Sequence, residues 1–474
     1  MDAIPLGEPG GSAVLPAPPA FPDDATRAVV NACLRRPLAQ GGSRSLRLLF
    51  TEGRTLALAP VETDLGDALK AFRASGLLVL DGGRVRSSVA LESVEGLFFA
   101  SDRRDDHRDG ALDYVLGLGG VTRRIAELMP RRTGSTMLDL GCGCGVLAIL
   151  SAQTAASATA VDINPRAVAF TRFNAALNDA GNVEALIGDL YQPVVDRQFD
   201  LIVSNAPYVI SPDSTFRYRD GGVGFCERMA RATPAHLAEA GCALLAANWP
   251  EIDGRPWQAD LAGWFEQAGC DTWVLCTGHL EPDEYAQMWL MQEHRGDVPT
   301  AALNRWVDSY RDAGFIRLHS GYCLLSRAAG REPWVEMRDL PPCDGLGGAA
   351  FDRVLAARDS ALRHDDAALC VLALSPIAGL EAIERRRPGP LGWQVESVDI
   401  RPSDGLRFTL RIDPVAADLL GWLDGTRSAA DAAHAFAIAS GRNPQTIVAA
   451  LPALLRSLLE AGLITDTTLQ SPSR

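Results

Sequence analysis

Short apolar runs alternate with helical patterns through the middle of the chain. The apolar runs read STMLDLG, ATAVDIN, VEALIGD, FDLIVSN and CALLAANW, and the helical stretches between them include PRAVAFTRFNAALNDAG. Strands that are apolar at nearly every position are typical of a parallel sheet with helices on both faces. The pattern therefore predicts a doubly wound α/β domain over residues 110–328.

A helix followed by a hairpin is predicted before this domain, and part of that pattern returns near the C-terminus. DLGDALKAFRASGLLVLDGGRVRSS predicts a helix, a break at Gly76, a strand, a turn and a second strand. PALLRSLLEAGLITDTT repeats the helix, the break and the strand around Gly462. Helix then hairpin is the pattern of a winged helix, so we expect two modules that dock a substrate or partner. The alternative is that such joints are simply common.

These patterns divide the chain into five predicted parts. Pro, Gly and Ala dominate residues 1–22, which predicts a disordered or loosely docked tail. The other four parts are a winged-helix-like docking domain over 23–109, the α/β domain over 110–328, a linker over 329–345 and an α/β or winged-helix-like domain over 346–474.

Composition narrows the class of protein. The 474 residues are 47% hydrophobic and carry a net charge of −14, which disfavours a broad nucleic-acid surface because phosphate binding needs clustered Lys and Arg. The ten cysteines have neither zinc-site spacing nor a signal peptide before them, and no apolar run reaches the roughly 20 residues of a membrane helix. We expect a cytoplasmic protein without a metal or a membrane anchor.

The sharpest local pattern is MLDLGCGCGVLAIL, where a buried strand carrying Asp139 turns through Gly141, Gly143 and Gly145 into a helix. Glycines let the backbone approach a ligand closely, and the helix N-terminus favours a negative group. A nucleoside-containing ligand is therefore expected. The spacing also fits a relaxed dinucleotide fingerprint, with Asp162 placed for ribose hydroxyls.

Three further features favour a different ligand. The Asp139 carboxylate suits a cationic amine, the third strand ends in Asp189, and the fourth ends in Asn-Ala-Pro-Tyr at residues 205–208. A nicotinamide enzyme needs none of these. Asn and Pro after a strand can also be ordinary turn residues, so the four residues are informative only together with the acids upstream.

The order and spacing of LDLGCGCG, VDINPRA, GDLYQP and FDLIVSNAPYV resemble the class I S-adenosylmethionine-dependent methyltransferases. Within them, the sequence resembles the branch with an Asn-Pro-Pro-Tyr motif, which includes release-factor glutamine N5-methyltransferases, small-domain methyltransferases and amino-methylating nucleic-acid enzymes. The resemblance implies a Rossmann-like fold and S-adenosyl-L-methionine as cofactor. It implies that the cofactor is bound by Asp139, Gly141, Gly143, Gly145, Asp162, Ile163, Asp189 and Leu190. Upstream, LDYVLGLGGVTRRIAEL resembles the segment that closes over the cofactor, with Gly119, Gly120 and Thr122 as candidates.

The same resemblance assigns the acceptor side to Asn205, Ala206, Pro207 and Tyr208. A planar nitrogen is a poor nucleophile because its lone pair is delocalised. The Asn205 side-chain oxygen and the Ala206 carbonyl would hold its two N–H bonds, and the Tyr208 ring would stack on the flat group. Ala206 departs from the family, which usually has proline there; the acceptor carbonyl remains, while the fixed φ is lost.

Three functions stay open on these grounds. The favoured one is N-methylation of a planar amide or amino nitrogen, on a glutamine-like side chain of a protein or peptide. The second is methylation of an RNA or DNA base, and the third is a non-catalytic winged-helix protein that senses the cofactor. Downstream, Asp220, Gly221, Gly222 and Gly224 partly match the glutamine-methylating branch. The oligomeric state is not indicated.

Overall fold

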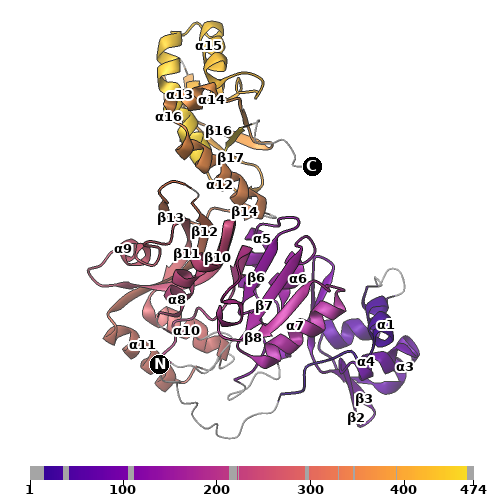
Figure 1. The fold of residues 1–474 in the computed structure, drawn as a ribbon. Helices are drawn as coiled ribbons and strands as arrows, with labels where there is room; N and C mark the ends of the chain where they lie inside the picture. The colour runs from indigo at the N-terminus through magenta and orange to yellow at the C-terminus, as the bar shows by residue number, and fades with distance from the viewer. Residues whose placement is uncertain are drawn as a thin grey trace. The chain divides into compact units, whose positions relative to one another are not determined.

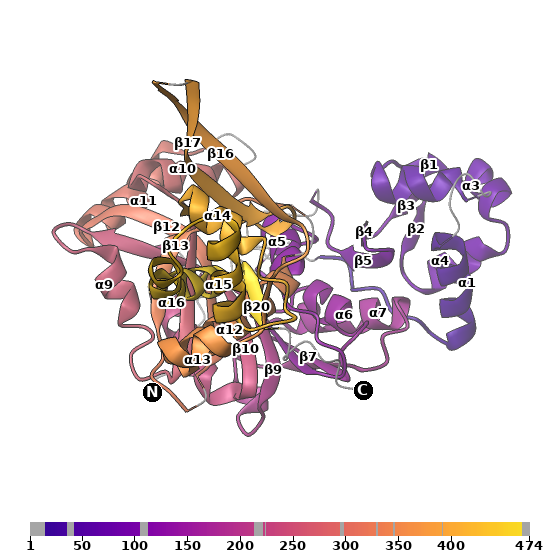
Figure 2. The same cartoon turned by 90° about the horizontal axis from the view of Figure 1, so that it is seen from above.

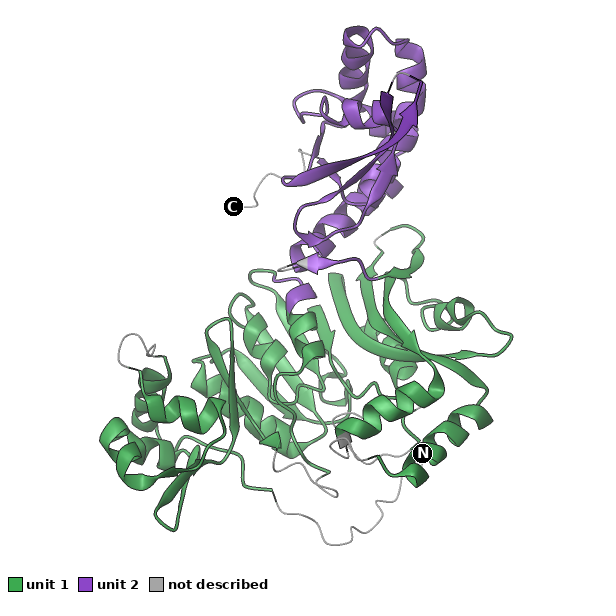
Figure 3. Cartoon of the chain, turned by 180° about the vertical axis from the view of Figure 1, so that it is seen from behind, with its two compact units in different colours: residues 1–126, 132–339 green, residues 127–131, 340–474 purple. Residues whose placement is uncertain are grey.

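The computed structural model describes residues 15–35, 42–104, 112–212, 221–222, 224–293, 298–328, 330–344, 347–390 and 392–466. The chain divides into two compact units (Figure 3). Unit 1 comprises residues 1–126 and 132–339, and unit 2 comprises residues 127–131 and 340–474.

A mostly parallel sheet forms the centre of unit 1. In the described part of the chain it has eight strands in the order β13-β11-β12-β10-β9-β6-β7-β8. Their bounds are β6 Thr136–Leu140, β7 Ser157–Asp162, β8 Val183–Ile187, β9 Phe199–Ser204, β10 Leu237–Ile252, β11 Cys270–Leu280, β12 Phe315–Arg327 and β13 Val335–Asp339. Strand β12 runs antiparallel to both of its neighbours. The predicted α/β class with a Rossmann-like sheet is confirmed.

The strand order reverses direction beside β6. The chain continues from β6 to β7 and β8 on one side, and β9 then returns to pair with β6 on the other. Leu140 lies opposite both Val161 and Ser204, so the carboxyl ends of three strands meet at one edge. Open α/β sheets bind ligands at such a reversal, outside the carboxyl ends of the strands.

Helices cover the sheet on both sides of this reversal (Figure 1). Helices α6 and α7 pack on β6, β7 and β8, whereas α8 and α9 pack on β10, and α10 and α11 on β12. The bounds are α5 Gly120–Leu128, α6 Val146–Ser151, α7 Pro165–Leu177, α8 Phe225–Ala232, α9 Trp257–Ala262, α10 Pro282–Glu293 and α11 Thr300–Asp312. Helix α7 begins as its sequence predicts, because Asn164 caps it through the amide of Arg166 and Pro165 opens the first turn.

A small module of helices and hairpins precedes the sheet in unit 1. The predicted helix and hairpin are α4 (Ala68–Ala74), β2 (Leu78–Asp81) and β3 (Arg84–Ser87), and Gly76 adopts a φ of +78° at the break. The other elements are α1 Asp24–Leu34, α2 Arg44–Leu46, the π-helix η2 Arg47–Thr51, β1 Leu56–Ala57, α3 Leu58–Leu65 and the hairpin strands β4 Ala90–Val94 and β5 Leu97–Ser101. The winged-helix assignment of this module stays a prediction.

Unit 2 combines helices with short sheets. Helix α16 (Pro444–Glu460) is followed by Gly462 at a φ of +65° and by β20 (Ile464–Asp466), which pairs antiparallel with β15 (Leu374–Pro376). A long hairpin of β16 (Leu380–Gly389) and β17 (Gly392–Pro402) extends beyond the helices of this unit (Figure 2). The remaining elements are β14 Cys343–Asp344, α12 Gly348–Arg363, α13 Asp366–Val371, β18 Gly405–Leu406, β19 Leu410–Ile412, α14 Pro414–Leu420 and α15 Ala429–Ala439. A winged-helix role for unit 2 also stays a prediction.

The segment expected to be a linker contains β13, which extends the sheet by pairing parallel with β11. Its pattern was hard to recognise because an edge strand buries few side chains, and those of β13 are half-buried or exposed. In the described residues no helix has the length and apolarity that crossing a bilayer requires. The same residues contain no group of three or more His, Cys, Asp or Glu side chains that could hold a metal ion.

Candidate active site

The glycine loop after β6 has a backbone that only glycine adopts without strain. Gly141, Gly143 and Gly145 have φ values of +67°, +55° and +82°. A Cβ at Gly141 would lie 2.9 Å from the Cα of Ala206, and one at Gly145 would lie 2.7 Å from the Thr171 side chain. The loop is therefore packed against the Asn-Ala-Pro-Tyr segment on one side and against α7 on the other.

Asp139 is buried directly before this loop, with 1% of its surface exposed. Its Oδ2 accepts a hydrogen bond of 3.1 Å from the Ala148 amide in α6. Burial raises the pKa of this carboxyl to about 7, and the nearby Asp162 charge adds to the shift. A positive group close to Asp139 would therefore favour the charged carboxylate and lower its pKa.

Asp162, at the end of β7, holds the glycine loop to the next strand. Its Oδ2 accepts from the Gly143 amide at 2.9 Å, and its Oδ1 accepts from the Asn164 amide at 2.8 Å. Burial raises the pKa of the Asp162 carboxyl, against the lowering effect of these two bonds. The next side chain, Ile163, is 53% exposed and forms an apolar surface at the same edge.

The third predicted acid lies one strand further out. Asp189 is exposed after β8, and Leu190 is half-buried with a φ of +46°, an uncommon conformation for leucine. The Gly188 amide donates to the Asp162 carbonyl at 3.0 Å, which brings the two strand ends together. The residues predicted from β6, β7 and β8 thus lie along one edge of the sheet, with Ile163 and Asp189 open to solvent.

Asn205 supplies the most informative atom of the site. Its Nδ2 donates a hydrogen bond of 2.9 Å to Thr122 Oγ1 in the first turn of α5. Its Oδ1 is buried and has no hydrogen-bond partner among the described residues. A buried acceptor without a donor is costly, and in a native protein it calls for an explanation such as a bound ligand.

Ala206 is fixed by hydrogen bonds of its own. Its amide donates to Ser204 Oγ at 3.0 Å, and Ser204 Oγ donates to the Leu140 carbonyl at 3.0 Å. A proline here would lack that amide. With alanine, a hydrogen bond from the backbone amide to Ser204 restrains this position, where proline would restrain it through its ring.

Tyr208 completes the predicted acceptor residues. Its half-buried ring meets Trp289 of α10 edge-on, with 6.1 Å between ring centroids, and burial raises the pKa of its hydroxyl. Pro207 lies against Gly221, where a Cβ would be 2.0 Å from the Pro207 carbonyl oxygen. Gly221 and Gly222 both donate to the Val209 carbonyl, so these glycines return to the motif, while Asp220 lies outside the described residues.

Two tyrosines that the sequence did not indicate as functional hold Ile210, two residues after the motif. Tyr285 Oη accepts from the Ile210 amide at 3.1 Å and from Asn248 Nδ2 at 2.6 Å. Tyr310 Oη donates to the Ile210 carbonyl. Both tyrosines come from the aromatic segment of α10 and α11, whose abundance of Trp and Tyr was the available signal.

The residues present fit a nucleoside cofactor with a cationic amine. The glycine loop leaves room for close approach, Asp139 and Asp162 supply carboxylates, and Ile163 and Leu190 supply apolar surface beside Asp189. The buried Asn205 Oδ1 lies beyond the glycine loop, on the segment that packs against Gly141. The site can therefore be divided into a cofactor half and an acceptor half.

Comparison with known proteins identifies two segments. Residues 119–250 match the methyltransferase small domain, and residues 350–466 match a domain of unknown function (DUF7782). The chain is 34% identical over 176 residues to a release factor glutamine methyltransferase of Cereibacter sphaeroides, covering 31% of this chain and 61% of that protein. It is 44% identical over 100 residues to a ribosomal protein L11 methyltransferase of Clostridium botulinum, covering 20% and 32%.

An arsenite methyltransferase of Halobacterium salinarum is 34% identical over 154 residues, covering 30% of this chain and 38% of that protein. The chain thus spans less than two thirds of each of these relatives. Among solved structures, the YcgJ protein from Bacillus subtilis matches 44% of this chain and 98% of its own, with 17% identity and a TM-score of 0.29. The fold assignment rests on the strand order instead.

Proposed function

Because residues 119–250 match the methyltransferase small domain, we propose that the protein methylates a planar amide or amino nitrogen of a protein or peptide, such as a glutamine side chain. The observation that carries this proposal is the buried Asn205 Oδ1 just after β9, which has no hydrogen-bond partner in the described part of the chain. An acceptor of this kind suits a substrate that brings its own N–H donor.

The cofactor half is proposed to hold S-adenosyl-L-methionine. The glycine loop would pass along the methionine part, and Asp139 would face its amine. Asp162 would accept from the ribose hydroxyls, while Ile163, Asp189 and Leu190 would border the adenine. When bound, the cofactor supplies an electrophilic methyl group on its sulfonium.

The acceptor half is proposed to prepare the nitrogen. Asn205 Oδ1 and the Ala206 carbonyl would accept hydrogen bonds from its two N–H groups. This would turn the nitrogen lone pair out of conjugation and toward the methyl group. The Tyr208 ring would lie on the flat face of the substrate group. Positioning of this kind is the main catalytic requirement of an in-line transfer. The methylated nitrogen would lose its proton after the transfer, so no strong base is needed.

A protein substrate is favoured over a nucleic acid. The net charge of −14 is unsuited to a duplex or a long single strand, which would require many phosphate contacts. The relatives named above include a release factor glutamine methyltransferase and a ribosomal protein L11 methyltransferase. A ribosomal RNA small subunit methyltransferase C of Chromohalobacter salexigens is also 34% identical over 131 residues. A base amino group presents the same planar N–H₂ and is the second candidate.

A label-transfer experiment tests the proposal. The protein is incubated with methyl-labelled cofactor and a cell extract, and the product is digested with protease or nuclease. Label released by protease supports a protein substrate, and label released by nuclease assigns the activity to a base. Asn205→Ala is the inactive variant, and Asn304→Ala, an exposed residue of α11, is its matched control. Cofactor binding without any label in wild-type reactions would instead support a non-catalytic sensor.

A further inference from the structure

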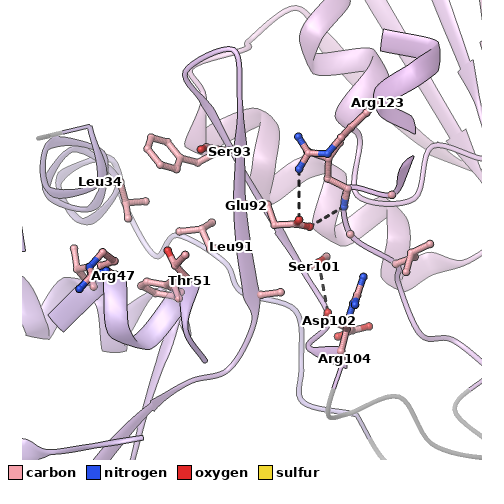
Figure 4. A pocket seen from close by; sticks show the side chains of 18 of the residues that line it. Leu34, Arg47, Thr51, Leu91, Glu92, Ser93, Ser101, Asp102, Arg104 and Arg123 are labelled. Carbon is pink, nitrogen blue, oxygen red and sulfur yellow. Dashed lines mark hydrogen bonds and ion pairs between the residues drawn. The ribbon is translucent and has the colours of Figure 1, made fainter. Parts of the chain in front are cut away.

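The hairpin of β4 and β5 reaches the segment that leads into α5. Glu92 Oε2, on β4, accepts a hydrogen bond of 2.9 Å from the Leu118 amide. Asp102, directly after β5, accepts from the Val115 amide at 2.8 Å through Oδ2. Figure 4 shows Glu92 directed toward this segment and toward Arg123. Two carboxylates of the N-terminal module therefore hold the backbone that precedes the site.

The Glu92 side chain approaches the backbone of this segment closely at Gly117. A Cβ at Gly117 would lie 2.6 Å from Glu92 Oε2 and 2.6 Å from Ser101 Oγ. Contacts below 3 Å require the backbone or its neighbours to move. The Gly117 backbone is thus fitted to these two side chains of the hairpin.

The segment held by Glu92 carries Thr122, which bonds Asn205. Thr122 lies only four positions after Leu118, and α5 begins between them at Gly120. Arg123 Nη2 also lies 3.8 Å from Glu92 Oε1, but this pair is half-exposed and contributes little. The charge-assisted bond to the Leu118 amide is the stronger of the two contacts.

The hairpin is itself anchored to α7 and to Asn178, the residue that follows this helix. The Asn174 side chain of α7 bonds both the amide and the carbonyl of Ala100, and Asn178 does the same for Phe98, at 2.7–2.9 Å. Asp102 forms a two-pronged, nearly buried ion pair with Arg166 of α7. Because the hairpin is held at several points, it can fix the position of the segment before α5 to which it is hydrogen-bonded.

The open cavity beside Glu92 has a volume of about 580 Å³ and includes Leu34, Phe50, Leu91 and Arg47 in its lining (Figure 4). The Glu92 side chain is 39% exposed toward this space. Its carboxylate has access to solvent, and its bond to the Leu118 amide is therefore not forced by burial.

We propose that Glu92 is a positioning residue for methyl transfer. By holding the Leu118 amide, it sets the start of α5, so that Thr122 meets Asn205 Nδ2 and Asn205 Oδ1 is aimed at the substrate nitrogen. The last step, in which Asn205 Oδ1 faces the substrate nitrogen, rests on the proposed function. The contacts that lead from Glu92 to Asn205 are independent of it.

The test compares Glu92→Leu, which removes the acceptor, with Glu92→Gln, which keeps an acceptor oxygen. The exposed Glu62→Gln in the same module is the control. With the acceptor identified by label transfer, we expect kcat to fall roughly tenfold in Glu92→Leu with little change in KM, because misplacing a catalytic group slows the step itself. Glu92→Gln should recover most of the rate, and Glu62→Gln should match wild type. Equal kcat values for wild type and Glu92→Leu would overturn the proposal.

Two further measurements separate positioning from general stability. In Thr122→Val the contact to Asn205 is removed directly, so adding Glu92→Leu should slow transfer little more; additive losses would count against a shared route. Without any substrate, the side-chain amide resonance of Asn205 should shift alike in Glu92→Leu and Thr122→Val and stay in place in Glu62→Gln. An unmoved resonance in Glu92→Leu contradicts the positioning role even if no methyl acceptor is found, whereas an absence of transfer in wild type contradicts only the proposed function.

Discussion

The two halves of the site differ in how their polar atoms are satisfied. In the cofactor half, the carboxylates of Asp139 and Asp162 already bond the amides of Ala148, Gly143 and Asn164 within the protein. In the acceptor half, Asn205 Oδ1 is buried and unpartnered among the described residues. The first half is complete as folded, whereas the second lacks a donor.

This difference separates binding from chemistry. A ligand that enters the cofactor half can replace existing hydrogen bonds with its own, so the total number of hydrogen bonds changes little. A ligand that donates to Asn205 Oδ1 removes an unsatisfied buried group, which is worth about 1–3 kcal/mol. Variants of the two halves should therefore fail in different measurements.

The largest effect is expected from Asn205→Ala, which removes the acceptor oxygen. Transfer should fall roughly 1000-fold, on the scale of losing one preorganised polar group in an active site. The dissociation constant of the cofactor, measured by calorimetry, should change less than about threefold. A comparable loss of cofactor affinity would show that the two halves are not separable.

A somewhat smaller effect is expected from Gly141→Ala, where the halves touch. The added Cβ meets Ala206 at 2.9 Å, and the φ of +67° strains any residue other than glycine. The free energy of unfolding should fall by about 2–4 kcal/mol, as measured by denaturant titration. Gly143→Ala has the same strain, but a Cβ there meets no atom within 4 Å, so it should cost less. Equal losses in both variants would rule out the contact with Ala206 as the cause.

The stability of the unliganded protein should depend moderately on pH through Asp139 in the cofactor half. The pKa of Asp139 is about 7 in the folded protein and 3.8 ordinarily, so the folded state binds the proton more tightly. Stability of the unliganded protein should therefore fall as pH rises from about 4 to 7 and level off above that. Thermal melting should show a shallower slope for Asp139→Asn. Cofactor affinity should change in the opposite sense, rising as the carboxylate forms beside the amine; identical slopes in both proteins would contradict this account.

The smallest effect is expected from Ala206→Pro, which restores the residue usual in the family. The acceptor carbonyl stays, while the bond from the Ala206 amide to Ser204 Oγ is lost. Transfer should change less than about threefold, and the unfolding free energy should fall by about 1 kcal/mol. Rate measurements on Ser204→Ala provide the comparison, since that variant breaks the same bond and keeps the alanine. A large rate loss in Ala206→Pro alone would implicate the backbone conformation.

Sequence predicts the parts of the site that are contiguous in the chain. The strand ends with Asp139, Asp162 and Asp189 follow from apolar runs and glycines, and the parallel sheet brings them to one edge. Contacts between distant segments were beyond that reasoning: Tyr310 bonds Ile210 from 100 residues away, and Glu92 bonds Leu118 across 26. A single Tyr or Glu has no pattern around it, because the geometry that makes it useful is set by tertiary packing.

Asn174 of α7 and Asn178, the residue directly after this helix, have a consequence for how far the proposed catalytic region extends. Asn174 and Asn178 use their side-chain amides as a strand edge for β5, and Asn174 also donates to the Cys144 carbonyl in the glycine loop. A fragment beginning at residue 110 would expose these amides and free one side of that loop. The smallest piece of this chain that can serve as an autonomous catalyst should therefore begin before Ala90, although the family match begins at residue 119.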